Sequence, residues 1–428
     1  MYLCRFLGAF LGAMLICSVG FAAEEAAVID SGDTAWVLAS AALVFFMTPG
    51  LAFFYGGMVR SKNVLSTMMQ SFFIIALISV QWILIGYTLA FGTSGGLIGG
   101  LDKMGLAGVS NSVVDTVPEY AFVAFQCMFA VITPALITGA FAERIRFAPL
   151  TLFILLWALL IYNPMAHWVW GGGWIEELGA LDFAGGLVIH ILSGVSGLVA
   201  ALMIGKRKGY GETPILPHNL PYTILGASML WFGWFGFNAG SALGANELAA
   251  NAFITTQAAT AAGVLGWSFM EWIRQGKPTA LGAVSGAIAG LVAITPAAGF
   301  VAPVPAIWIG LIGGLVCYFA VAVIKGKLGY DDSLDAFGIH GFGGIWGAIA
   351  TGLWATLEVN ADGANGLFYG GSDLLMAQLI SVAFTVVFAA VGTVVLLSIV
   401  KWVMKIRPTD SEEVIGLDIT EHGERAYN

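Results

Sequence analysis

The sequence predicts an all-α membrane protein with many transmembrane helices. Of its 428 residues, 59% are hydrophobic and only 10% are charged, whereas soluble domains carry about a quarter charged residues. The mean hydropathy is +0.89. The apolar share corresponds to about 250 residues, enough for about 11 or 12 spans of ~20 residues each. A chain of this composition does not stay in solution as one large globule.

Other features of the composition exclude several functions. Glycine contributes 57 residues, well above its usual ~7% share, which suits close helix packing in lipid. The net charge of -9 and the lack of a basic run argue against a nucleic-acid partner. Cys127 and Cys317 stand singly in apolar runs, so we expect no disulfide framework, no metal site and no cofactor.

Residues 1–22 have the pattern of a signal peptide. Arg5 supplies the positive start, an apolar core follows, and Gly20-Phe21-Ala22 forms a small-x-small cleavage site. The alternative is an uncleaved first span. In both cases the acidic residues from Glu24 onward are expected to be exported.

Eleven apolar segments of span-like length follow. We therefore assign residues 23–405 to a transmembrane channel domain and residues 406–428 to a cytoplasmic C-terminal tail. The segments are 34–58, 64–91, 119–142, 148–170, 186–205, 219–243, 250–272, 280–297, 303–324, 337–357 and 374–403.

The basic residues predict the orientation of these segments. If the mature N-terminus lies outside, 15 of the 16 basic residues that remain after Arg5 is removed fall on the inner side. Lys103 alone lies outside. Because a miscounted span would scramble this pattern, we expect eleven helices with the N-terminus out and the C-terminus in, in the cell inner (cytoplasmic) membrane.

A weak internal repeat relates the fifth and tenth segments. The pattern H-x3-G-x2-G begins at His190 and again at His340. In both copies an aspartate and a short glycine-containing stretch precede the histidine. Because the two segments are five apart, they enter the membrane from opposite faces. This predicts an inverted repeat of five plus five helices with an eleventh added, a type of fold in which the site lies between the repeats.

Two histidines and one aspartate are the candidates for chemistry. Because a histidine inside a membrane is costly, we expect it to have a function. The alternative is a structural histidine whose ring hydrogen-bonds to a backbone carbonyl. A facing pair can share one proton, but like charge and desolvation keep both rings from being charged. When residues are counted along ideal helices, His190 and His340 lie near opposite faces. They therefore meet only if both helices begin inside the membrane and not at its surface. Asp182 is a helix cap, a group that attracts cations, or both.

Aromatic residues gather in three places, around 124–129, 167–170 and 231–237. An aromatic belt at the membrane interface explains most of them. Periodicity alone does not select the side chains that line a pore.

The sequence resembles the ammonium transporter (Amt) family of the Amt/Rh superfamily along essentially the whole mature chain. Many motifs occur in the family's order. They are FYGGMVRSKNVLS (54–66), AFQCMF with GAFAERIRF (124–147), HWVWGGG with LDFAGGLVIH (167–190), PHNLP with GWFGFNAGSALGANE (217–247), DAFGIHGFGGIWG (335–347) and GLDITEHGERAYN (416–428).

The resemblance implies a bacterial ammonia channel of the ammonium-transporter fold, and not an enzyme. It implies that ammonium is recruited at an outer vestibule, loses its proton, and crosses as ammonia through a hydrophobic pore. The implied substrate-binding residues are Trp170, Phe129, Ser241, Phe125 and Asp182. The implied pore gate is Phe129 with Phe237, and the pore-lining twin histidines are His190 and His340.

The resemblance also implies partners. These are ammonium and methylammonium as substrates for nitrogen uptake, two further subunits in a homotrimer, and a PII-type regulatory protein at the cytoplasmic face. Two alternatives remain open. An ammonium sensor on this fold usually carries an added signalling domain, whereas about 25 residues follow the last segment here. A bis-histidine haem electron carrier is the other, although membrane cytochromes usually offer more histidine pairs.

Overall fold

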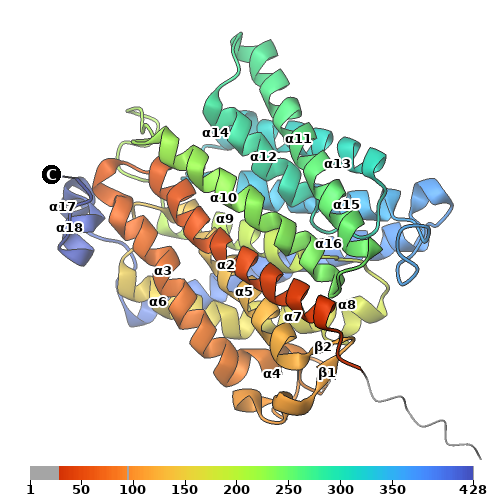
Figure 1. The fold of residues 1–428 in the computed structure, drawn as a ribbon. Coiled ribbons are helices and arrows are strands. Elements are labelled where there is room, and N and C mark those ends of the chain that lie inside the picture. Colours follow the sequence, from red (N-terminus) through yellow and green to blue (C-terminus); the bar gives the residue numbers. More distant parts are fainter. Residues whose placement is uncertain (1–27, 94–95, 428) are drawn as a thin grey trace, which may run out of the picture.

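The computed structural model describes residues 28–93 and 96–427 (Figure 1). The expected signal peptide, residues 1–22, lies outside the described residues. The described part is mostly helical, with loops between the helices. Two short strands, β1 (Val113–Val114) and β2 (Val117–Pro118), form an antiparallel pair in a connecting loop.

Long α-helices form the body of the molecule, and several continue through a turn of wider π-helix or tighter 3-10 helix. The α-helices are α2 (Ser31–Met58), α3 (Val64–Gln81), α4 (Tyr87–Phe91), α5 (Glu119–Ile137), α6 (Phe147–Trp157), α7 (Asn163–Trp170), α8 (Trp174–Glu177), α9 (Leu192–Ile204), α10 (Leu220–Ala239), α11 (Glu247–Gln275), α12 (Ala280–Ile294), α13 (Pro303–Phe319), α14 (Lys325–Leu328), α15 (Phe342–Trp354), α16 (Asp373–Val403), α17 (Asp410–Ile415) and α18 (Leu417–His422). The π-helical turns are η2 (Trp82–Gly86), η6 (Ala158–Tyr162), η7 (Gly186–Ile191), η9 (Ala320–Ile324) and η10 (Phe337–Gly341). The 3-10 turns are η1 (Ser61–Asn63), η3 (Met104–Leu106), η4 (Val109–Asn111), η5 (Thr138–Phe141), η8 (Gly240–Ala242) and η11 (Leu367–Tyr369).

Each of the eleven predicted apolar segments overlaps one run of consecutive helices, called a rod below, although several segments extend up to three residues past the helix end. Within the described residues, 8 rods are long and apolar enough to cross a membrane, and Ala280–Ile294 is a shorter apolar helix. The predicted class, an all-α polytopic membrane protein, is confirmed.

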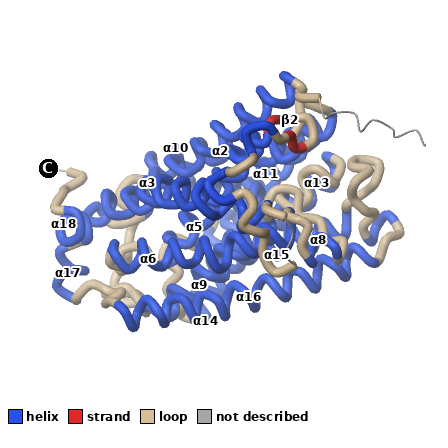
Figure 2. The backbone as a smooth tube through the Cα atoms, turned by 90° about the horizontal axis from the view of Figure 1, so that it is seen from below, coloured by secondary structure: helices blue, strands red, loops and turns tan. Residues whose placement is uncertain are grey.

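Small residues let the rods approach closely. α2 runs along α10 in both views of the chain (Figures 1 and 2). At Gly226 of α10, a Cβ atom would lie 2.7 Å from the Cα of Phe54. Gly282, Gly286 and Gly290 of the eighth segment are spaced four residues apart along α12 and allow the same close approach, because a Cβ at Gly286 would lie 2.7 Å from the Gly263 carbonyl oxygen of α11. Such contacts replace the hydrophobic effect as the packing force in lipid.

The C-terminal tail is docked on the bundle. α17 and α18 lie at one end of the molecule, and α2 begins at the other (Figures 1 and 2). Arg146, just before α6, forms ion pairs with Glu412 and Glu421 of the tail. The Thr409 amide and the Arg146 guanidinium lower the pKa of Glu412 to about 2. Glu412 therefore keeps its charge to a lower pH than an ordinary glutamate does.

Replacing Gly286 with leucine is expected to destabilise the protein. The new side chain has no room against α11, and overpacking of this kind costs about 1–3 kcal/mol. The melting temperature of the purified protein in detergent measures the effect. Gly326→Leu is the matched control, because a Cβ at Gly326 meets nothing within 4 Å. Equal melting temperatures for the two variants would contradict the packing interpretation.

Candidate functional site

A cavity of about 460 Å³ lies between α5, α7, α8 and the loop before η7. Seven of its 19 lining residues are aromatic. Its charged lining residues are the carboxylates Glu176, Asp182 and Asp362, with no lysine or arginine among the described residues. We call it the outer vestibule, since the predicted orientation places it outside. An aromatic and acidic lining favours a small cation.

The residues predicted for substrate binding converge on this vestibule. Trp170, Phe125, Phe129 and Ser241 all line it. The Trp170 ring stands edge-on to Phe129 with ring centroids 6.1 Å apart. The Ser241 hydroxyl donates to the Phe237 carbonyl oxygen at 2.9 Å, which leaves its oxygen free to accept a hydrogen bond from a bound donor.

Two phenylalanines close the floor of the vestibule. Phe129 and Phe237, predicted as the gate, are stacked with centroids 4.4 Å apart and an interplanar angle of 25°. Phe129 faces the vestibule, and Phe237 lines the narrow space beyond it. Both rings are fully buried. The stack therefore lies between the vestibule and that narrow space.

Asp182 is a helix cap in this structure. Its carboxylate accepts backbone N–H groups of residues 185 to 188 at 2.6 to 3.3 Å. These are the unpaired donors at the start of η7, and the negative charge also suits that end of the helix. The Trp170 indole donates to the Asp182 carbonyl oxygen at 2.7 Å. The aspartate thereby fixes both the start of η7 and the indole of the vestibule.

The two predicted histidines meet. The Nδ1 atoms of His190 and His340 lie 3.2 Å apart, and their rings are 5.2 Å apart between centroids. One Nδ1 must carry a proton and the other must accept it, so the neutral pair shares one N–H. The Trp234 indole stacks on His190 at 5.4 Å. His190 Nε2 has no hydrogen-bond partner among the described residues.

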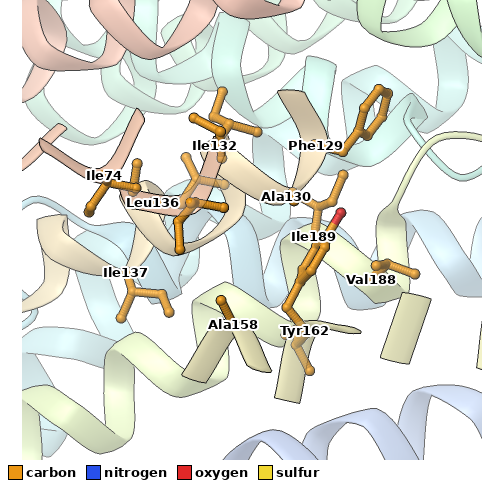
Figure 3. Close-up of a cluster of buried hydrophobic side chains, with 14 of the residues drawn as sticks. Ile74, Phe129, Ala130, Ile132, Leu136, Ile137, Ala158, Tyr162, Val188 and Ile189 are labelled. Atoms are coloured by element: carbon orange, nitrogen blue, oxygen red, sulfur yellow. The ribbon is translucent and has the colours of Figure 1, made fainter. Parts of the chain in front are cut away.

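The histidines sit in a narrow apolar lumen below the phenylalanine stack. Its volume is about 10 Å³, close to the space that one water molecule needs. Figure 3 shows Ile132 and Leu136 of α5 and Ile189 of η7 among the buried hydrophobic side chains, and all three line the lumen. Besides the two histidines, the lining residues are Met47, Leu51, Phe54, Ile132, Leu136, Ile189, Leu230, Trp234, Phe237 and Ile288.

The internal repeat explains how the histidines reach each other. Each lies in a π-helical turn, and each turn is capped by an aspartate eight residues earlier, Asp182 for His190 and Asp332 for His340. In the sequence repeat, the aspartate nearest before His340 is Asp335, so the pattern alone pairs Asp182 with Asp335 and this pairing is wrong for the cap. A π turn holds more residues than an α turn. Counting along ideal α-helices therefore places the rings of His190 and His340 on the wrong faces. At Gly344 a Cβ would lie 3.0 Å from His190 Cβ, so the repeated glycine lets the two broken helices cross.

A second cavity, of about 350 Å³, is lined in part by the same segments of chain as the lumen. α2 contributes Phe54 to the lumen and Met58 to this cavity. Likewise, His340 lines the lumen, while Lys325 and Asp335 line this second cavity. We call it the inner vestibule.

Sequence reasoning missed some residues of the path. Trp234 belongs to a recognised aromatic cluster, but only the structure shows that it stacks on a histidine. Asp332 carried a usable signal, because its spacing to His340 repeats that of Asp182 to His190. Lys325 and Asp335 are ten residues apart across a turn. The repeat includes Asp335 as the aspartate before His340, but no sequence pattern predicts its ion pair with Lys325.

The fold and the site together define an integral membrane protein with two vestibules joined by a narrow apolar lumen. The family model "Ammonium Transporter Family" matches residues 35–427. The chain belongs to this family, which makes it a transporter and not an enzyme.

Individual relatives are similar over nearly their whole length. The ammonium transporter of Bacillus subtilis (strain 168) is 58% identical over 402 residues, which cover 93% of this chain and 99% of the relative. Among solved structures, Saccharomyces cerevisiae Mep2 has a TM-score of 0.84 at 38% identity, covering 89% of this chain and 91% of Mep2. A structure described as a sensor Amt protein has a TM-score of 0.86 at 30% identity, covering 91% and 98% of the two chains.

Asp182→Ala is expected to lower both stability and transport. It leaves buried N–H groups at the start of η7 without an acceptor, at about 1–3 kcal/mol for each group left unsatisfied. Asp182→Asn keeps one acceptor oxygen and should be intermediate. Thermal unfolding and transport assays on the purified protein measure both effects, with Asp362→Ala of the same vestibule as control. An alanine variant as stable as the unmodified protein would refute the capping role.

Proposed function

We propose that this chain conducts ammonium nitrogen across the membrane as neutral ammonia. Ammonium is recruited in the outer vestibule by Trp170, Phe125, Phe129 and Ser241, with Asp182 holding the local structure. It then loses its proton, and ammonia passes the Phe129–Phe237 gate and the paired histidines. The observation that carries this proposal is the contact between His190 and His340 inside an apolar lumen of about 10 Å³.

Magnitudes favour the neutral species. A dry ion in an apolar medium costs tens of kcal/mol by the Born estimate. Cation–π contacts return about 0.5–2 kcal/mol each, so the vestibule can hold ammonium but cannot carry it through the lumen. Ammonia avoids the cost and can hydrogen-bond to the imidazoles. Potassium has no proton to lose, so the same barrier excludes it.

We further propose eleven spans with the N-terminus outside and the tail in the cytoplasm, in the inner (cytoplasmic) membrane, after removal of residues 1–22. Two observations support this topology. The basic residues alternate as the orientation rule requires. In addition, α2 begins at the end of the molecule opposite α17 and α18 (Figure 1), as an odd number of spans demands.

We also propose a homotrimer with one pore per subunit, methylammonium as a second substrate, and docking of a PII-type regulatory protein on the tail. The family resemblance supports all three. The position of α17 and α18 on the proposed cytoplasmic end gives such a regulator access. Size measurement of the detergent-solubilised protein, and pull-down of a PII-type protein by the inner face, test these partners.

The two alternative functions are a bis-histidine haem electron carrier and an ammonium sensor. A haem does not fit between the histidines, because their rings are in direct contact and the lumen is too small. A sensing role is compatible with the fold, given the similarity to a sensor Amt protein. Rescue of a transporter-deficient strain at low ammonium, with methylammonium as competitor, separates transport from sensing alone.

Replacing both His190 and His340 with leucine is expected to abolish selective ammonium transport, because the lumen then offers no polar atom to ammonia or its proton. Ammonium-driven currents and uptake in proteoliposomes provide the measurement. The same substitution at His422 of the tail is the control. Full and selective ammonium transport by the double variant would overturn the mechanism.

A further inference from the structure

The inner vestibule holds an ion pair that the proposed mechanism does not use. Lys325 Nζ of α14 lies 2.5 Å from Asp335 Oδ1. The lysine side chain is 17% exposed and the aspartate side chain 28% exposed. Both line this cavity, and Asp335 stands five residues before His340.

Asp335 adopts a backbone conformation that usually belongs to glycine. Its φ angle is +60°, and the residue at the equivalent position of the other repeat is Gly185, with φ +117°. Side chains with a Cβ atom rarely adopt positive φ, although aspartate tolerates it better than most. A carboxylate kept where the other repeat has glycine points to a role for the carboxylate.

The other charged groups around the pair are already engaged. Arg207 also lines the inner vestibule, but Asp331 binds its guanidinium at 2.8 Å, and Glu143 lies 3.6 Å from it. Asp332 accepts the backbone N–H groups that open η10. Lys325 is therefore the cation that faces Asp335.

The two mouths of the lumen differ in charge. The outer vestibule has carboxylates and, over the described residues, no lysine or arginine in its lining. Lys103, the basic residue expected outside, is neutralised by Glu119 at 2.6 Å. At the inner mouth, the Asp335 carboxylate already has the primary ammonium group of Lys325 beside it. The end of a lysine side chain is chemically an alkylated ammonium ion with three N–H donors.

We propose that Lys325 is a specificity-determining residue that occupies the cation position beside Asp335 as a tethered ammonium group. Ammonium from the cytoplasm then finds no vacant carboxylate at the inner mouth. The inference rests on the proposed ammonium transport. Its consequence is that half-saturation requires more ammonium for outward than for inward transport.

Thermodynamics restricts how this asymmetry is expressed. For passive transport at equal pH and zero voltage, the ratio of maximum rate to half-saturating concentration is the same in both directions. A vacant inner cation site must therefore lower the outward half-saturating concentration and the outward maximum rate together. A merely structural role for Lys325 would alter inward and outward transport alike.

Initial rates of ammonium transport in both directions, in proteoliposomes with oriented protein, test the proposal. Lys325→Gln is expected to lower the outward half-saturating concentration about tenfold, the effect of one charge-assisted contact, with a matching fall in outward maximum rate. Its inward parameters should be unchanged. Lys325→Arg should keep the asymmetry. Lys327→Gln, an exposed lysine on the same helix, is the matched control.

Combining Lys325→Gln with Asp335→Asn removes the site altogether and is expected to restore the high outward value. If Lys325→Gln alone does not fold, Asp335→Asn is compared with the double variant Asp335→Asn, Lys325→Gln. These two proteins are expected to have the same outward half-saturating concentration. Equal half-saturating concentrations for the two directions in the unmodified protein would overturn the inference. It would also be overturned if Lys325→Gln changed the half-saturating concentrations of both directions, or of neither. Absence of any ammonium transport would instead overturn the proposed function.

Discussion

The cost of placing a charge in the lumen is the constraint on which the other features depend. The lumen is apolar and has a volume of only about 10 Å³, so an ion must shed its hydration to enter, at tens of kcal/mol. In the proposed mechanism this barrier provides the selectivity. The vestibule binds the cation, the phenylalanine stack separates the vestibule from the lumen, and the histidine pair supplies the polar contact that a neutral molecule can use.

Backbone geometry makes that polar contact possible. Two polar rings can face each other in an apolar interior only if each helix begins inside the bundle, where its first N–H groups would otherwise lack acceptors. Asp182 and Asp332 accept those groups, and glycines at the crossing allow the two broken helices to approach. The same element built twice thus brings one imidazole from each repeat to the same point. The repeats are not identical, since the inner copy carries the Lys325–Asp335 pair.

Much of this arrangement is predictable from the sequence, for physical reasons. Lipid demands long apolar helices, so composition and segment lengths predict the class of fold, and the repeated pattern at His190 and His340 identifies the central pair. The contact between those rings is not predictable from helical periodicity, because the π turns change how residues face. The stacking of Trp234 and the pairing of Lys325 with Asp335 depend on three-dimensional proximity, for which this sequence carries no periodic signal.

The central claim is that the lumen passes a neutral molecule and rejects a cation of similar size. The most direct measurement compares potassium and ammonium fluxes through the unmodified protein in the same proteoliposomes. The account predicts rapid ammonium transport, with a potassium flux no greater than that of protein-free liposomes. A potassium flux comparable to that of ammonium would contradict it.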